Sequence, residues 1–316
     1  MQRLLIASPH CYADLARLWY RFVRRDLVPS FADAGYQVTV VIYRDVNAQQ
    51  FREKDFQGAT LCAPGPRARD FMEFYDFALV EAHDFLLILD ADAFIVDGAW
   101  ATSQLLRFED PSVSAVSLVP RKNSPAIYAI LCRCEHFREL TPPVFPGHYQ
   151  SPESWPNSIN LQPGDLAFQR LLAAGKKIIT IDVQESERHV ANFHGTTVVR
   201  LCRDLFADQI GDSQFEDLIQ RERYYTVGAY DNALLGALYE RLFDEAYAPD
   251  CSGTPLGGSL SLPRLRSILT RISKPEQRST LRRWFESSDR AILSMAAHES
   301  IDLAIPDLIP QDWNAS

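Results

Sequence analysis

The chain has 316 residues, of which 47% are hydrophobic and 23% are charged, and its formal net charge at pH 7 is −9. This length is enough for one large α/β domain or two smaller ones, and the apolar fraction predicts a packed globular core. A net acidic chain without a long basic run is a poor candidate for binding nucleic acid, so we expect no nucleic-acid partner.

Neither a signal peptide nor a membrane span is expected. The first apolar run has only four residues before a polar turn, and no apolar run approaches the length that crosses a bilayer. The six cysteines are scattered and form no CxxC pair, which is typical of reduced thiols in a core. We therefore expect a cytoplasmic protein.

Residues 1–95 alternate between segments typical of strands and of helices. Apolar residues at helical spacing predict the helices, and short apolar or β-branched runs predict the strands. In chain order the expected elements are a strand over 3–9, a helix over 14–34 that Gly35 ends, a strand over 36–43, a short strand and turn over 59–67, a helix over 69–82 and a strand from Phe85.

The rest of the chain continues this pattern and then becomes helical. The expected elements are a helix over 100–108, a strand over 112–120, a strand and helix start over 126–137, a proline-rich loop over 141–164, a helix over 165–177 and a strand over 178–182. From about residue 211 the pattern is mainly helical. The sequence therefore predicts an α/β domain over 1–210 and a helical C-terminal extension over 211–316.

Two aspartates follow the strand in the segment "FLLILDADAF". The strand and helix alternation predicts an α/β fold with a mostly parallel mixed sheet between helices, and such sheets bind ligands beyond the carboxyl ends of their strands. Asp90 and Asp92 are at such an end, and residues two apart on a strand point to the same face. This placement favours a role in chemistry, while the alternative interpretation is a strand-end aspartate that caps the next turn.

The spacing of Asp90-Ala91-Asp92 suits a divalent cation on a diphosphate. Hard cations prefer oxygen ligands, and a cation can neutralise the charge that develops on a departing phosphate. With a small residue between the two carboxylates, one can bind the ion and the other can reach a ribose or a metal-bound water. A D-x-D pattern alone occurs often by chance.

Two later segments join this pattern. They are "GDLAFQRLLAAGKKIITID", with Asp165 at the start of a helix, and "NFHGTTV", which contains His194. Together the three segments resemble the GT-A-fold glycosyltransferases, the nucleotide-diphospho-sugar transferase superfamily, over about residues 1–200. The resemblance implies that the domain over 1–210 is a GT-A-like domain that binds the nucleotide sugar and carries out catalysis.

The resemblance implies a metal-dependent enzyme that moves a sugar from a nucleotide diphosphate sugar to a hydroxyl of a small-molecule or glycan acceptor. Asp92 and His194 would bind Mn²⁺ or Mg²⁺, while Asp90 and Ala91 would contact the nucleotide. Asp165 takes the place of a general base, which favours inversion. Retaining members also carry a DxD and a late histidine, so both stereochemical outcomes remain open.

Several of these positions have a second interpretation. Asp165 is also a favoured helix N-cap residue, and His189 competes with His194 as the metal ligand. Ser8 and His10 lie at the end of the first strand, where the resemblance implies a nucleotide-binding loop, although turn residues at a strand end look alike.

The main alternative function is a haloacid dehalogenase-like phosphatase. In that case Asp90 is the nucleophile and Asp92 the general acid, with Lys176 or Lys177 and the acidic segment 211–217 in supporting roles. Phe94 replaces the expected Thr or Val, strands precede the motif, and residues before 211 form a poor strand pattern. A second alternative is a non-catalytic nucleotide-binding protein.

The segment 262–284 is locally basic and carries apolar residues at helical spacing. A solvated basic face over a packed apolar stripe explains this pattern. The alternatives are a homo-oligomer formed through these helices and contact with anionic lipid.

Overall fold

The computed structural model describes residues 1–44, 51–62, 83–120, 125–126, 128–140, 165–197, 199–200, 211–247, 261–310 and 313. The chain forms two compact units, Met1–Val190 and Ala191–Ser316. Each unit is described by itself. The assignment of residues 1–210 to a catalytic domain stays a prediction.

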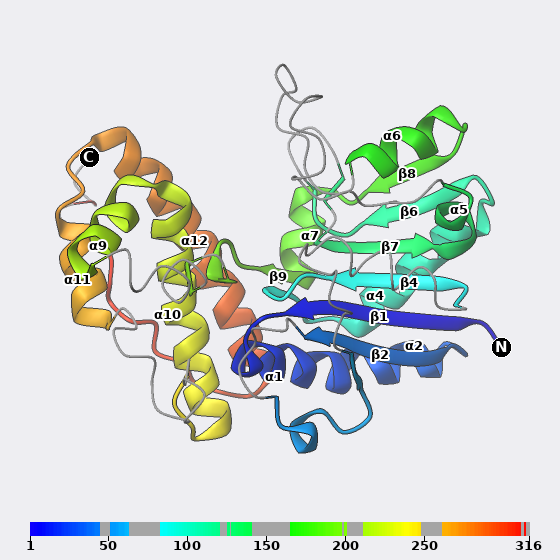
Figure 1. Ribbon diagram of the computed structural model, residues 1–316, viewed down its shortest axis with the longest axis horizontal. Helices are drawn as coiled ribbons and strands as arrows, with labels where there is room; N and C mark the ends of the chain where they lie inside the picture. The colour runs from blue at the N-terminus through cyan, green and yellow to red at the C-terminus, as the bar shows by residue number, and fades with distance from the viewer. Residues whose placement is uncertain are drawn as a thin grey trace. The chain divides into compact units, whose positions relative to one another are not determined.

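The first unit contains a seven-stranded mixed sheet in the order β3-β2-β1-β4-β7-β6-β8 (Figure 1). Strand β7 is antiparallel to both of its neighbours, and the other strand pairs are parallel. The strands are β1 (Arg3–His10), β2 (Gln37–Arg44), β3 (Thr60–Cys62), β4 (Phe85–Leu89), β6 (Val113–Ser117), β7 (Ala129–Arg133) and β8 (Lys177–Thr180). The predicted α/β class with a mostly parallel mixed sheet is confirmed.

Helices cover both faces of the sheet. The helical elements are α1 (Ala13–Phe22), the π-helix η1 (Val23–Leu27), α2 (Val28–Asp33), the 3₁₀ helix η2 (Glu53–Phe56), α4 (Gly98–Ser103), the 3₁₀ helix η3 (Gln104–Glu109), α5 (Cys134–Arg138), α6 (Asp165–Ala173) and α7 (Val183–His189). On one face, Leu86 and Ile88 pack in a cluster with Phe137 of α5 and Phe168 of α6. On the other, Phe85 packs against Phe108 of η3. Because both faces are buried, the central strands are continuously apolar.

The predicted helix over 14–34 is one continuous helical run that changes its hydrogen-bond pattern in the middle. Its central part, η1, is a π-helix, and Pro29 follows directly in α2. Proline has no N–H to donate to the preceding turn, so the regular α-helical pattern cannot pass through it. The run ends at Gly35, whose φ of +89° suits glycine and whose N–H donates to the carbonyl of Ala32.

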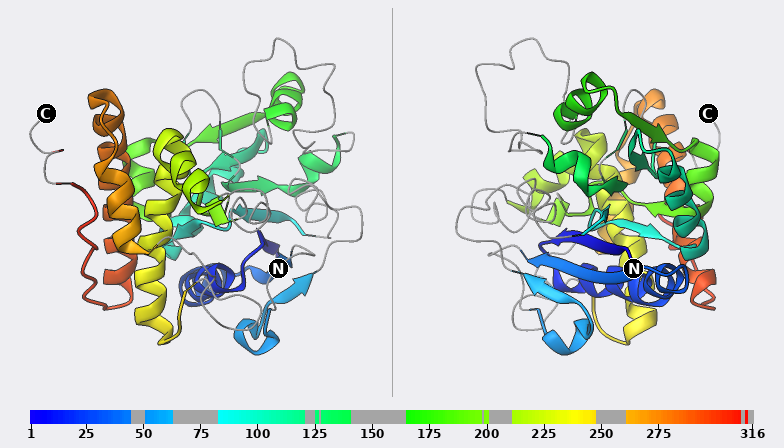
Figure 2. Two further views of the ribbon diagram at one scale, coloured as in Figure 1. Left: turned by 60° about the vertical axis from the view of Figure 1, so that its left-hand side comes forward. Right: turned by 90° about the vertical axis from the view of Figure 1, so that its right-hand side faces the viewer.

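The second unit is mainly helical, as predicted, and Figure 2 shows its long helices from two further sides. It contains the helices α9 (Asp212–Arg221), α10 (Arg223–Phe243), α11 (Leu262–Thr270) and α12 (Pro275–His298). It also contains residues 191–192 of the short strand β9 (Val190–Asn192). Helices α10 and α12 pack against each other through the Tyr230 and Phe285 rings, which stack with centroids 3.9 Å apart. None of the helices in the described part of the chain combines the length and hydropathy of a membrane-spanning segment.

The basic segment after residue 261 packs within its own unit. Leu265 and Ile268 of α11 are fully buried, whereas Leu262 is 41% exposed. Arg264 and Arg271 form ion pairs with Glu216 of α9. This agrees with a packed apolar stripe under a basic face, and association through these helices stays a prediction.

Four expectations lie partly or wholly outside the described residues or differ from the structure. The expected strand and turn over 59–67 is described only as far as β3, and its turn lies outside the described residues. The predicted helix over 69–82 and the loop over 141–164 lie outside them. The expected helix over 100–108 is the short α4 followed by η3. Helix α7 was not predicted, because Ser186 is its only buried residue and no apolar period marks it.

Candidate functional site

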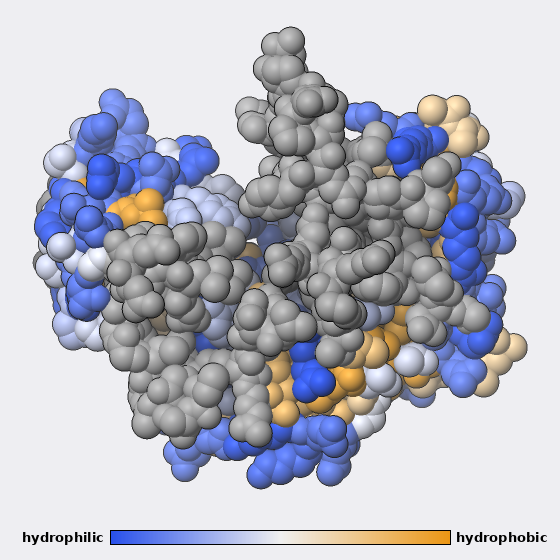
Figure 3. Space-filling model, viewed as in Figure 1, coloured by the Kyte–Doolittle hydropathy of each residue, from blue (hydrophilic) through white to orange (hydrophobic). Residues whose placement is uncertain are grey.

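The carboxyl ends of the parallel strands meet at one edge of the sheet. In the β1–β4 pair Ala7 lies opposite Ile88, and in the β1–β2 pair His10 lies opposite Arg44. The segments that follow, Ser8–His10 on β1 and Asp90 after β4, therefore lie at the same edge. This is where ligands bind in sheets of this kind. In the space-filling view, hydrophilic (blue) and hydrophobic (orange) residues lie next to one another on the surface that is drawn in colour (Figure 3).

Asp90 and Asp92 lie on a tight turn between β4 and β5 (Ala93–Ile95). The backbone N–H of Asp90 donates to the carbonyl of Tyr128 at 2.7 Å, which extends the β4–β7 ladder by one bond. The N–H of Ala93 then donates back to the carbonyl of Asp90 at 3.1 Å. The two carboxylates are thus turn residues, and the strand-alternation argument that placed them on one face does not apply to them.

Burial raises the pKa of Asp90 to about 6. The N–H of Ala91 has a smaller, opposite effect, because its hydrogen bond to Asp90 Oδ1 favours the charged form. Asp90 and Asp92 are both half-buried, and Ala91 between them is 2% exposed. A carboxylate that is costly to ionise gains most from a nearby cation, which lowers its pKa. Asp90 is therefore suited to a site that a cation or a donor group occupies.

Ser8 and His10 are fully buried beside this turn, at 0% and 1% exposure. Among the described residues, neither the Ser8 Oγ nor either ring nitrogen of His10 has a hydrogen-bond partner. The His10 ring packs edge-on against Trp19, and burial lowers the pKa of His10 to about 3, so the imidazole is neutral. A neutral imidazole offers one donor and one acceptor. Each unpaired buried group costs roughly 1–3 kcal/mol, which a polar ligand would offset.

A further cluster in the first unit was missed by sequence reasoning. Asp97 caps α4 by accepting the N–H of Trp100 at 2.9 Å, and its other oxygen lies 3.0 Å from His189 Nδ1. The Trp100 ring stacks on His189 with centroids 4.7 Å apart, and Trp100 Nε1 donates to Glu185 at 2.9 Å. The signal in the sequence was the capping residue Asp97 before Gly98. Through these contacts His189, at the end of α7, packs against the start of α4.

His194, the predicted metal ligand, belongs to the second unit. Its backbone N–H donates to Asp231 Oδ2 at 2.7 Å, and its ring lies edge-on against Trp284 with centroids 4.6 Å apart. Burial lowers the pKa of His194 to about 4, so its imidazole is in the neutral form that metal ligation requires. Asp92 lies in the other unit, and a metal site shared by the two stays a prediction.

The glycine after His194 is required by the backbone. Gly195 has φ +69°, and a Cβ there would lie 2.9 Å from the carbonyl oxygen of Tyr224. A Cβ on Gly228 of α10 would collide with the backbone of Gly195. Two glycines thus let the segment that carries His194 pass close to α10.

Asp165, the predicted base, is the first residue of α6. That position agrees with either the catalytic or the capping interpretation, and its side chain lies outside the described part of the chain. Its catalytic role stays a prediction.

The geometry disfavours the phosphatase alternative. Strands β4 and β6 are both antiparallel to β7, and β8 is parallel to β6, so Lys177 at the start of β8 lies at the edge opposite Asp90. Lys177 Nζ pairs there with Asp110 at 2.8 Å. The acidic segment 211–217 belongs to the second unit and forms the N-cap, Gly211, and the first residues of α9.

The donor set fits a hard cation only in part. Among the described residues, no three His, Cys, Asp or Glu side chains come together as a metal cluster. Mg²⁺ is commonly held by one or two carboxylates together with substrate phosphates. Asp90 and Asp92 therefore fit a cation whose remaining ligands arrive with a diphosphate.

The first unit is thus an α/β protein whose sheet edge gathers two carboxylates, a buried hydroxyl and a neutral imidazole. Solved structures with a similar fold include a mannosyltransferase from Pyrobaculum calidifontis in complex with GDP-Man and Mn²⁺, at 14% identity and a TM-score of 0.44, covering 94% of this chain and 87% of that one. S. aureus TarS 1–349 has 9% identity and a TM-score of 0.40, with 98% of each chain covered. A Drosophila β1,4-galactosyltransferase 7 mutant in complex with manganese, UDP-Gal and xylobiose has 13% identity and a TM-score of 0.40, covering 63% and 73%.

No family model and no curated protein matches the chain. The similarities to solved structures are distant. The function proposed below rests on the residues of this chain.

Proposed function

We propose that the protein is a glycosyltransferase that uses a nucleotide diphosphate sugar and a divalent cation, Mn²⁺ or Mg²⁺. The observation that carries the proposal is the turn at Asp90–Asp92, placed at the carboxyl edge of the sheet beside the buried and unpaired polar groups of Ser8 and His10. A nucleotide sugar brings what this edge lacks, because its diphosphate completes a metal site and its nucleoside offers hydrogen-bonding groups.

In this proposal Asp92 binds the cation, and Asp90 binds the ribose or a metal-bound water. The cation supplies charge neutralisation for the departing diphosphate. Ser8 and His10 hold the nucleoside, with the neutral His10 ring able both to donate and to accept. His194 is the proposed further metal ligand.

Asp165 is the proposed general base of an inverting transfer. It takes the proton of the acceptor hydroxyl, whose oxygen forms a bond to the anomeric carbon while the bond from that carbon to the diphosphate oxygen breaks. A helix start suits this role, because the carboxylate is anionic before it accepts the proton and the helix dipole favours that form. Retention of configuration in the product would contradict this part of the proposal.

The first experiment is a thermal-shift screen of the full chain with UDP-, GDP- and TDP-sugars, each with and without Mn²⁺. A ligand that binds only the folded state adds about 2.7 kcal/mol to the free energy of unfolding at 100 times its Kd. The melting temperature rises as a result. We expect one nucleotide to stabilise the protein and only in the presence of metal. Stabilisation by none of them would contradict the proposal.

The second experiment compares Asp92→Asn with Asp33→Asn, an exposed carboxylate at the end of α2 in the same unit. Loss of electrostatic stabilisation at a reacting centre typically lowers kcat by about 100-fold or more, which is expected for Asp92→Asn alone. Nucleotide binding without any transfer would favour the non-catalytic alternative. Covalent trapping of Asp90 by a phosphate-mimicking fluoride would favour the phosphatase.

A further inference from the structure

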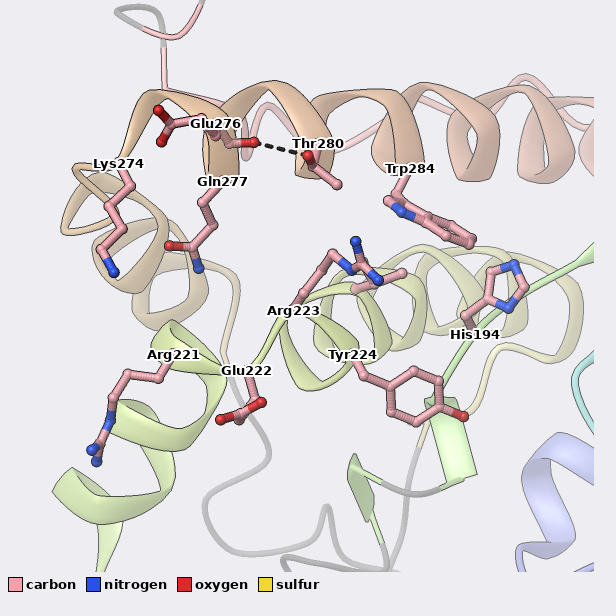
Figure 4. A pocket seen from close by; sticks show the side chains of 11 residues that line it. His194, Arg221, Glu222, Arg223, Tyr224, Lys274, Glu276, Gln277, Thr280 and Trp284 are labelled. Carbon is pink, nitrogen blue, oxygen red and sulfur yellow. Dashed lines mark hydrogen bonds between the residues drawn. The ribbon is translucent and has the colours of Figure 1, made fainter. Parts of the chain in front are cut away.

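A cavity of ≈ 740 Å³ lies within the second unit, between the start of α10 and the start of α12 (Figure 4). Small-molecule sites in proteins typically measure about 300–1,000 Å³. The predicted reaction assigns no ligand to this cavity apart from the metal at His194. Its chemistry therefore indicates what else it could bind.

The charged end of the cavity has more positive than negative groups. Arg221, Arg223 and Lys274 line it together with Glu222 and Glu276. Within the described part of the chain, the side chains of Arg223 and Lys274 have no ion-pair or hydrogen-bond partner, and both residues are exposed. Three cations against two carboxylates leave a net charge of one positive. The site therefore favours a ligand with a small negative charge.

The two carboxylates restrict the ligand further. A carboxylate can only accept hydrogen bonds, so Glu222 and Glu276 favour a ligand that carries hydrogen-bond donors. A polyhydroxylated molecule with one acidic group suits both the cations and the carboxylates.

The other end of the cavity is aromatic. Figure 4 shows Trp284, Tyr224 and His194 gathered there, with the Arg223 side chain extending from the charged side toward them. Tyr224 is 50% exposed. The rings of Trp284 and His194 are nearly perpendicular, with their centroids 4.6 Å apart. Aromatic side chains combine a large apolar surface with a polar group. The C–H face of a sugar ring can pack on such a surface while its hydroxyls remain paired.

We propose that this cavity binds a saccharide that carries one acidic group, with a sugar ring against Trp284 and the acidic group on Arg223 and Lys274. The acidic group is a carboxylate, as in a uronic acid, or a phosphate ester. That the bound saccharide serves as the acceptor rests on the proposed transferase function. Its binding to the cavity does not.

The test uses the full chain without metal or nucleotide, and titrates tryptophan fluorescence and saturation-transfer NMR signals with three probes. They are a disaccharide ending in glucuronic acid, its neutral glucose counterpart, and glucose 6-phosphate. We expect at least one acidic probe to bind about tenfold more tightly than the neutral one, because a hydrogen bond to a charged group contributes about that factor. Which acidic probe binds better distinguishes carboxylate from phosphate.

The variants locate the site. The double variant Arg223→Gln with Lys274→Gln should lose about tenfold or more in affinity for the acidic probe. Arg283→Gln removes an exposed arginine of α12 that does not line the cavity and should bind as the wild type does. Both variants replace exposed side chains, so unfolding is not expected, and circular dichroism checks this.

Several outcomes would overturn the inference. They are the absence of binding by both acidic probes, equal binding of the neutral disaccharide, and unchanged affinity in the double variant. Metal-free UDP that binds more tightly than the saccharides, and is lost in the double variant, would make the cavity a nucleotide site instead. Asp92→Asn should bind the saccharide as the wild type does, because Asp92 does not line the cavity. Saccharide binding can therefore be tested even if the transferase proposal fails.

Discussion

Replacing Asp231 with Asn should make the second unit more stable relative to the wild type as the pH rises. Asp231 is fully buried in α10, its Oδ2 accepts the backbone N–H of His194, and its Oδ1 has no partner among the described residues. Burial raises the pKa of Asp231 to about 7, which outweighs the nearby His194 N–H and Ser288 hydroxyl, both of which favour the charged form. The folded protein therefore resists ionisation of this carboxyl.

The magnitude follows from the difference between the folded and unfolded states. The pKa of Asp231 rises from 3.8 to about 7, and each pKa unit corresponds to about 1.36 kcal/mol. Well below pH 3.8 the acid is protonated in both states and costs nothing. As the pH rises through the interval, the unfolded state loses its proton first, and the folded state is destabilised by up to about 4 kcal/mol above pH 7. Roughly 2.5 kcal/mol of this loss develops between pH 5 and pH 8.

The assay is urea unfolding of wild type and Asp231→Asn at pH 5 and pH 8, followed by tryptophan fluorescence. The asparagine oxygen can still accept the His194 N–H, while its unpaired buried amide adds a cost of about 1–3 kcal/mol that is the same at both pH values. We expect the stability difference to shift by about 2.5 kcal/mol in favour of the variant from pH 5 to pH 8. Asp302→Asn, at an exposed position of the same unit, should show no such shift. A difference that is equal at both pH values, or one that moves toward the wild type, would refute the reasoning.

Two further predictions concern the first unit. Gly98→Ala should destabilise the protein by about 1–3 kcal/mol, because a Cβ at Gly98 would collide with the carbonyl oxygen of Asp26 in η1; the melting temperature checks this against Gly211→Ala, whose Cβ would meet nothing closer than 3.9 Å. Metal-dependent nucleotide binding should weaken as the pH falls through about 6, where Asp90 takes up a proton and no longer attracts a cation. Titrations on either side of pH 6 should show the loss in the wild type and not in Asp90→Asn, and an unchanged wild-type affinity would argue against a role for Asp90.

The sequence predicted elements well where the signal was local. The strands β1, β2 and β4 and the helical run up to Gly35 follow from apolar runs, helical spacing and a glycine in a left-handed conformation. Helix α7 was missed because it lies almost entirely on the surface, and the cap that starts it, Asp182 accepting the N–H of Gln184, resembles an ordinary turn in sequence. A hydrogen bond between residues two apart is local, but its geometry is not visible in the pattern.

The candidate site was predicted in part for the same reason. A buried strand that ends on two aspartates marks Asp90 and Asp92 as edge residues in any parallel sheet. Their arrangement on a turn depends on the hydrogen bond from Asp90 to Tyr128, a residue far along the chain. The stacking of Trp100 on His189 likewise joins distant segments and has no local signal.

The sequence by itself determined the α/β class, the mostly parallel sheet and the sheet edge at which Asp90 and Asp92 lie. It could do so because the spacing of apolar residues that distinguishes strands from helices is a property of short segments. Only the tertiary structure decided which polar groups lost their water. Burial holds His10 and His194 neutral and makes ionisation of Asp90 and Asp231 costly. It also takes folding to bring the starts of α10 and α12 together around a cavity, since desolvation and shape arise from residues that are distant in the chain.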